Sequence, residues 1–218
     1  MKWLRTFLWM LALLPLTACG LSGGPFEGQV LEANTNKPIP GAIVIVRWQG
    51  TYDQLVESKT VCYHVETATT NADGRYKIPP WHETTKGPFF AQGAWLIDAY
   101  KAGYETYWPP GFGSSEAYKK NVRYLAPFKG TREARLASLQ QTIRATGCTS
   151  AGVSMKNLYP LYSAIYDEAK PLDTRPEDKD IVQWIRQIAA RVWVSQYRPA
   201  TESEIQRLMN EHLRENLK

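Results

Sequence analysis

The sequence predicts a fold that is mainly β plus α: a small β-sandwich over residues 26–128, then an α-helical region over residues 129–218. Two observations support this prediction. Between Phe26 and Phe128, short apolar segments rich in β-branched residues are separated by turn sequences, as in small antiparallel sandwiches. From Thr131 onwards, apolar residues recur every three or four positions, which is the spacing of amphipathic helices.

Residues 1–18 have the pattern of an export signal. Lys2 and Arg5 form a positive start, and Phe7–Leu16 is an apolar run without charge. Because a helix needs roughly 20 residues to cross a bilayer, this shorter run indicates a secretory signal peptide. The run ends in Leu16-Thr17-Ala18-Cys19-Gly20, which resembles the lipobox of bacterial lipoproteins.

The lipobox resemblance implies that Cys19 becomes the lipid-bearing first residue and that its acyl chains hold the protein on a membrane. Gly20 stands where an aspartate would resemble an inner-membrane retention signal. We therefore expect the outer membrane, with the protein facing the periplasm. The alternative is an ordinary cleaved signal with a chance cysteine. Residues 19–25 are predicted to be a short flexible tether.

The predicted strands follow in order after the tether. Apolar alternation, or a dense apolar run, marks residues 26–32, 42–48, 60–70, 75–78, 94–101 and 121–125. Asn71-Ala72-Asp73-Gly74 is predicted to be a hairpin turn in which Gly74 takes a positive φ. No internal repeat or low-complexity segment interrupts this region.

The predicted helices cover residues 133–144, 157–169, 177–197 and 202–217. Two of them are preceded by sequences that fit capping boxes, Thr174-Arg-Pro-Glu177 and Thr201-Glu-Ser-Glu204. In a capping box the threonine oxygen and the glutamate side chain satisfy free backbone amides. Arg186 and Arg191, on the third predicted helix, are expected on a solvated face.

The three cysteines allow one internal disulfide. If Cys19 is lipidated, Cys62 and Cys148 remain in an oxidising compartment. We expect them to form a bond that ties the third predicted strand to the loop after the first predicted helix. Two buried free thiols are the alternative.

Several β segments resemble the carboxypeptidase regulatory-like domain, a transthyretin-like (prealbumin-like) sandwich. The matching pieces are Gly28-Gln-Val30, Lys37–Val44, Thr69–Tyr76 with Ile78-Pro79, and Ala99–Tyr104. The resemblance covers residues 26–107 and leaves the helical region unexplained. It implies a non-catalytic binding or structural role without a particular ligand.

Few residues are suited to catalysis or metal binding. His82-Glu83 begins like a zinc motif, but Lys86 stands where the second histidine belongs. His64 and His82 flank the predicted hairpin, and a hydrolase or metal enzyme built on them is the main alternative to a non-enzyme. The expectation is no catalysis, no metal and no cofactor. The dispersed net charge of +5 does not indicate nucleic-acid binding.

Aromatic residues flanked by proline or glycine are the predicted binding residues, because rigid loops on a sandwich commonly carry recognition. They are Trp81, Phe89, Trp108 and Phe112. They could stack on a glycan or grip a protein in the envelope; alternatively they cover the core. The sequence thus predicts a non-catalytic envelope lipoprotein acting as a binding or scaffold module. An accessory factor in envelope assembly or secretion is a further alternative.

Overall fold

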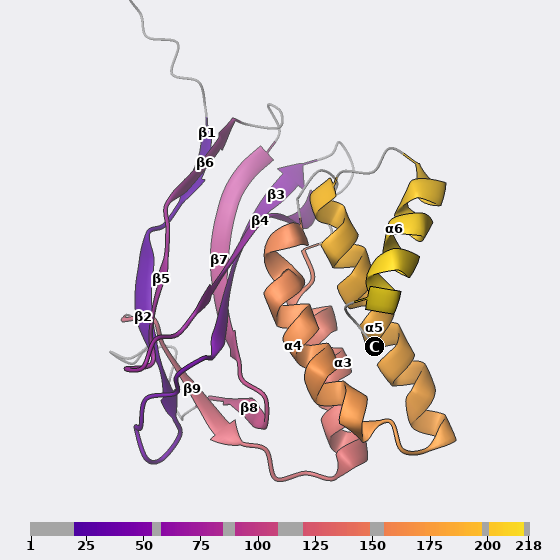
Figure 1. Ribbon diagram of the computed structural model, residues 1–218. Coiled ribbons are helices and arrows are strands. Elements are labelled where there is room, and N and C mark those ends of the chain that lie inside the picture. The colour runs from indigo at the N-terminus through magenta and orange to yellow at the C-terminus, as the bar shows by residue number, and fades with distance from the viewer. Residues whose placement is uncertain are drawn as a thin grey trace, which may run out of the picture.

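The computed structural model of the protein describes residues 20–53, 58–84, 90–108, 120–148, 155–197 and 201–215. These residues form three layers: an outer β-sheet, a central β-sheet that packs against it face to face, and a layer of helices on the other face of the central sheet (Figure 1). A fold that combines β and α structure in this chain order is what the sequence predicts.

The outer sheet has the strand order β5-β2-β9-β8. Its strands are β2 (Phe26–Glu32), β5 (Arg75–Ile78), β8 (Tyr104–Tyr107) and β9 (Val122–Pro127). β2 and β9 run parallel, and the other two pairs are antiparallel. The sheet therefore brings the first predicted strand beside the last one.

The central sheet has the order β4-β3-β7 and is antiparallel. Its strands are β3 (Ile43–Asp53), β4 (Ser58–Thr69) and β7 (Phe90–Tyr100). Val44 and Val46 pack in the core between the sheets, whereas Ile43 and Ile45 pack against the helices. Because both faces of β3 are covered, its sequence is a continuous apolar run instead of an alternating one.

Part of the predicted tether is a strand. β1 (Gly20–Gly23) pairs antiparallel with β6 (Trp81–Thr84) in a small third sheet. The side chain of Leu21 is 3% exposed and packs in the core between the sheets. This buried contact and the backbone pairing with β6 explain why the segment is ordered, although its Ser/Gly-rich sequence is typical of a linker.

The turn at Asn71–Gly74 joins two sheets and is not a hairpin. β4 belongs to the central sheet, and β5 pairs with β2 of the outer sheet. Gly74 has φ +67°, the predicted positive value. The Asn71 Oδ1 atom accepts from the amides of Asp73 and Arg75 at 3.0 and 2.9 Å. A local asparagine–glycine turn thus suits a corner between sheets as well as a hairpin.

The helical layer contains α3 (Arg132–Thr146), α4 (Tyr159–Ala169), α5 (Pro176–Val194) and α6 (Glu202–Glu215). Short 3-10 turns η2 (Met155–Leu158), η3 (Lys170–Leu172) and η4 (Ser195–Tyr197) flank α4 and α5. No helix among the described residues is both long and apolar enough to span a membrane.

One of the two predicted capping boxes is wrong. Arg175, not Thr174, is the N-cap of α5. Pro176 occupies the first helical position, so the helix begins one residue after the start that a Thr174 cap would give. At α6, the Thr201 hydroxyl accepts from the Glu204 amide at 3.2 Å, the threonine half of the predicted box.

A buried ion pair fixes the helices to the central sheet. The Arg135 guanidinium on α3 donates to both carboxylate oxygens of Glu168 on α4, at 2.7 and 2.8 Å. The same carboxylate accepts from the Tyr100 hydroxyl of β7 at 2.6 Å and from the Gly103 amide at 2.9 Å. Burial raises the pKa of Glu168, but these hydrogen bonds outweigh burial and leave the pKa below its ordinary value.

Candidate functional site

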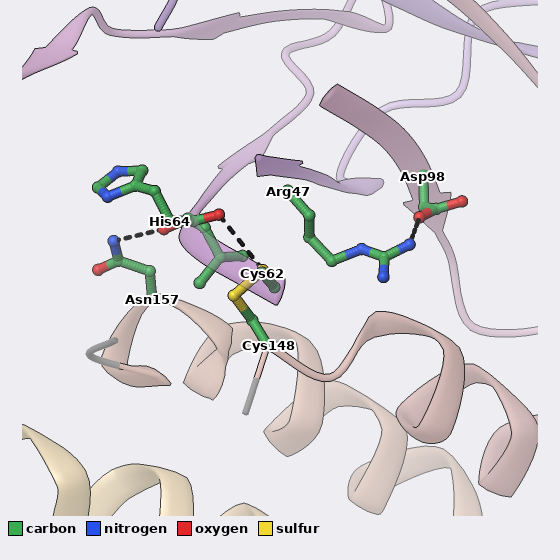
Figure 2. The surroundings of a disulfide bond; sticks show 7 residues. Arg47, Cys62, His64, Asp98, Cys148 and Asn157 are labelled. Carbon is green, nitrogen blue, oxygen red and sulfur yellow. Dashed lines mark hydrogen bonds and ion pairs between the residues drawn. A yellow bond between two sulfur atoms is a disulfide. The ribbon is translucent and has the colours of Figure 1, made fainter. Parts of the chain in front are cut away.

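The predicted disulfide is confirmed. Cys62 on β4 and Cys148, two residues after α3, are bonded, with their Cα atoms 5.2 Å apart (Figure 2). Both residues are buried. The bond joins the central sheet covalently to the end of α3, so the helical layer is not a separate unit tethered to the sandwich.

Hydrogen bonds next to the disulfide attach η2 to the same strand. The Asn157 side chain donates to the Val65 carbonyl at 3.0 Å, and the Thr67 hydroxyl donates to the Asn157 carbonyl at 2.7 Å. Figure 2 shows Asn157 and Cys148 approaching β4 from the helical side. Both ends of the chain stretch between α3 and η2 are therefore held on β4.

Arg47 lies on the same side of the central sheet (Figure 2). Its guanidinium contacts the Asp98 carboxylate of β7 at 2.7 Å, in a mostly buried pair. The Asp98 carboxylate neutralises Arg47, the one arginine that β3 buries. Such pairing is needed because an unpaired charge is costly in an apolar layer.

A pocket of about 350 Å³ opens in the helical layer beside the disulfide. Its buried wall is formed by Ile143 of α3, Tyr162 of α4 and Val192 of α5. The rest of its apolar lining is partly exposed and consists of Met155 of η2 and Trp184 and Ile188 of α5. Gly147, next to Cys148, lines it too. We call it the helical pocket. Its size and apolar walls are typical of small-molecule sites, which are roughly 300–1,000 Å³.

Two exposed arginines line the helical pocket: Arg144, in the last turn of α3, and Arg191, in the last turn of α5. The Arg144 guanidinium lies over the Trp184 ring, 5.8 Å from its centroid. The arrangement combines an apolar interior with positive charge at the exposed edge.

Trp81, one of the four predicted binding residues, packs into an aromatic cluster. Its ring stacks on His64 with centroids 3.8 Å apart and planes 11° apart. Trp48 and Tyr63 meet the same ring at 5.2 and 5.8 Å. Gly23 must stay a glycine here, because a Cβ atom would overlap the indole nitrogens of Trp48 and Trp81. Trp81 is therefore partly buried and packs against the core between the sheets.

A β-bulge explains how His64 reaches this cluster. The register between β3 and β4 shifts after Trp48, so Gln49 faces Cys62 and Trp48 faces His64. One additional residue, Tyr63, is accommodated between them, as in a β-bulge. Cys62 thereby points to the helices, while Tyr63 and His64 both contact Trp81 between the sheets.

The structure does not bring His64 and His82 together as a pair. His64 Nε2 lies 2.9 Å from a carboxylate oxygen of Glu66. Trp81 stacks on His64, and neighbouring side chains of a strand point to opposite faces, so the exposed His82 points away. In the described part of the chain, no three histidine, cysteine or acidic side chains gather as a metal site.

The remaining predicted residues divide into two groups. Trp108, which directly follows β8, is 55% exposed. Cys19, Phe89 and Phe112 lie outside the described residues.

The sequence interpretation missed the helical pocket. Arg191 is exposed as expected. Arg186, however, is half-buried and donates to the Leu213 carbonyl of α6 at 2.7 Å. Trp184 and Ile188, one turn apart on α5, are the sequence signal of a partly exposed apolar stripe beside Arg191. Comparison with protein-family models, with curated proteins and with solved structures finds no match to this chain.

Proposed function

We propose that this protein is a non-catalytic binding module of the bacterial envelope, anchored through a lipid on Cys19 and facing the periplasm from the outer membrane. The lipobox-like sequence supports the anchor. We further propose that the two sheets form a carboxypeptidase regulatory-like, transthyretin-like sandwich. In support, the segments that resemble this domain fall on β2, β3, the β4–β5 turn and the β7–β8 turn of one continuous sandwich.

The helical pocket is the observation that carries the binding function. Its walls come from η2, α3, α4 and α5. The Cys62–Cys148 bond and the contact of Tyr100 with the Arg135–Glu168 pair fix α3 and α4 to the central sheet, and Arg132 of α3 pairs with Asp178 of α5. Pre-organised walls lower the entropic cost of binding a ligand. A helical layer stapled to a small sandwich is thus suited to present a fixed site.

Trp108 favours a second contact with a protein or glycan partner. Exposed large apolar side chains are few among the described residues, namely Leu96, Trp108 and Tyr197, and Trp108 is the most exposed of them. Tryptophan is also the residue type most enriched at binding hot spots. Its position after β8 places it on the sandwich, so that contact would be separate from the helical pocket.

A neutral apolar dye tests the pocket. The fluorescence of N-phenyl-1-naphthylamine should rise when it is titrated with the purified protein, since the dye enters an apolar cavity. Ile188→Trp should remove the rise by filling the pocket, and the protein should keep or gain stability, because filling a cavity commonly adds about 0.5–2 kcal/mol.

Leu96→Trp is the matched control, because it adds the same side chain at an exposed apolar position on β7, outside the pocket lining. It should leave dye binding unchanged. If the wild-type protein does not bind the dye, or if both variants bind it equally, the pocket is not a binding site.

The anchor is tested by mass spectrometry of the mature N-terminus, which should begin with an acylated Cys19. Cys19→Ala should leave the signal sequence uncleaved by the lipoprotein peptidase. A mature protein that starts at another residue without lipid would contradict the proposed anchoring.

A further inference from the structure

The charges at the helical pocket are unbalanced. Several other arginines of the helical layer have carboxylate partners: Arg132 and Arg175 contact Asp178, and Arg135 contacts Glu168. Arg186 and Arg214 instead donate to backbone carbonyls. Among the described residues, no ion pair includes Arg144 or Arg191.

Neither α3 nor α5 has an acidic residue one turn away from Arg144 or Arg191. The residues three and four before Arg144 are Gln141 and Gln140, and the residue four before Arg191 is Gln187. An arginine on a helix contacts residues three and four positions before and after it, and none of these positions is acidic for Arg144 or Arg191. Among the residues that the structure describes, the pocket lining contains no aspartate or glutamate. Two cations on different helices thus border one apolar pocket, and no carboxylate of the described residues pairs with them.

The apolar interior and the charged edge are complementary to two halves of one molecule. The interior can bury a hydrocarbon chain, which gains free energy in proportion to the apolar area removed from water. A guanidinium binds a carboxylate through parallel, charge-assisted hydrogen bonds. A ligand with an alkyl chain and one anionic head satisfies both parts at once.

We infer that the helical pocket binds an anionic amphiphile, an alkyl carboxylate whose chain lies along Ile188 and Trp184 and whose head group lies at Arg144 and Arg191. This inference rests on the proposed binding function and adds the chemical class of the ligand. The head group remains at the exposed edge, so binding does not require the carboxylate to be desolvated in the apolar interior.

Displacement of the dye measures this selectivity. Decanoate and decan-1-ol, used below the concentrations at which they aggregate, have the same chain and differ in the head group. A pocket with apolar contacts alone favours the alcohol, because a carboxylate is more costly to remove from water. The ratio of the two dissociation constants therefore isolates the contribution of the arginines from that of the chain.

The double variant Arg144→Gln/Arg191→Gln should bind decan-1-ol as the wild type does and bind decanoate about tenfold more weakly, the effect of losing one to two charge-assisted contacts near the surface. Raising the salt concentration should also weaken the binding of decanoate to the wild type relative to decan-1-ol, because exposed charges are screened. Arg207→Gln is the control, since Arg207 is an exposed arginine of α6 outside the pocket.

Charge reversal tests the assignment with the opposite sign. Arg144→Glu/Arg191→Glu should bind decyltrimethylammonium more tightly than decanoate. If the decanoate-to-decanol ratio changes less than twofold in the glutamine variant while the dye still binds, the anionic ligand class is wrong and the proposed pocket stands. Failure of the wild type to bind the dye overturns the proposed function, and this inference with it.

Discussion

Removing the Cys62–Cys148 bond should lower the stability of the whole protein, because the bond closes a long loop. The two cysteines are 86 residues apart in the sequence. For a loop of this length, the chain-entropy model gives about 4.6 kcal/mol at 25 °C as the stabilisation that comes from restricting the unfolded chain. The variant to measure is Cys62→Ala/Cys148→Ala, since a single change would leave a reactive thiol.

Contacts that survive in the variant limit the loss. Asn157 still bonds to Val65, and Tyr100 still bonds to Glu168, so α4 and η2 stay on the central sheet. Both sulfur atoms are buried, however, and their removal leaves a small cavity that adds to the cost. We expect a net loss of about 2–5 kcal/mol, a large part of the roughly 5–15 kcal/mol that stabilises a typical domain.

Urea unfolding monitored by tryptophan fluorescence measures the change. The midpoint should fall, and the m-value should rise, because the unfolded chain without the cross-link exposes more surface. Wild-type protein unfolded with dithiothreitol should behave like the double variant. A loss below about 1 kcal/mol with an unchanged m-value would refute the loop-closure reasoning and show that the other contacts alone hold the layers together.

Two further predictions concern single side chains. Trp108→Ala should change the free energy of unfolding by no more than about 0.5 kcal/mol, because the ring is largely exposed; a large fall in the melting midpoint would instead place the ring in the core. Glu168→Gln should reduce the acid sensitivity of the fold. The depressed pKa of Glu168 means that its contribution is fully present above the unfolded value of 4.5 and is lost as the pH falls through the lower folded value. Between pH 7 and pH 3, the wild type should therefore lose more stability than the variant, and equal losses would contradict the role of the carboxylate.

Local pattern was sufficient for most elements of the fold. The limits of β2 and β5 agree with the predicted strands to the residue, and α3 extends only one or two residues beyond its predicted ends. The positive φ of Gly74 also followed from its sequence. These features depend on residues close in the chain, whose side-chain period and backbone preference are visible in the sequence.

Counting was sufficient for the disulfide, because lipidation of Cys19 would leave a single pair of cysteines. The identity of the bonded residues followed from that count, and the structure confirms it. What the bond connects physically, the central sheet and the end of α3 beside the pocket, depends on the packing of the layers.

Pairing between segments far apart in the chain could not be predicted from the sequence. Gly20–Gly23 form a strand because they pair with β6, some sixty residues later in the chain. In the same way, β5 pairs with β2, although a turn sequence links β5 to β4. The bulge at Tyr63 sets which face His64 occupies, and a shift of one residue reverses that choice without any change in composition. The helical pocket draws its walls from three helices and η2, so Arg144 and Arg191 come together only when those helices pack. Such contacts are set by the free energy of burying complementary surfaces far apart in the chain, which no local period encodes.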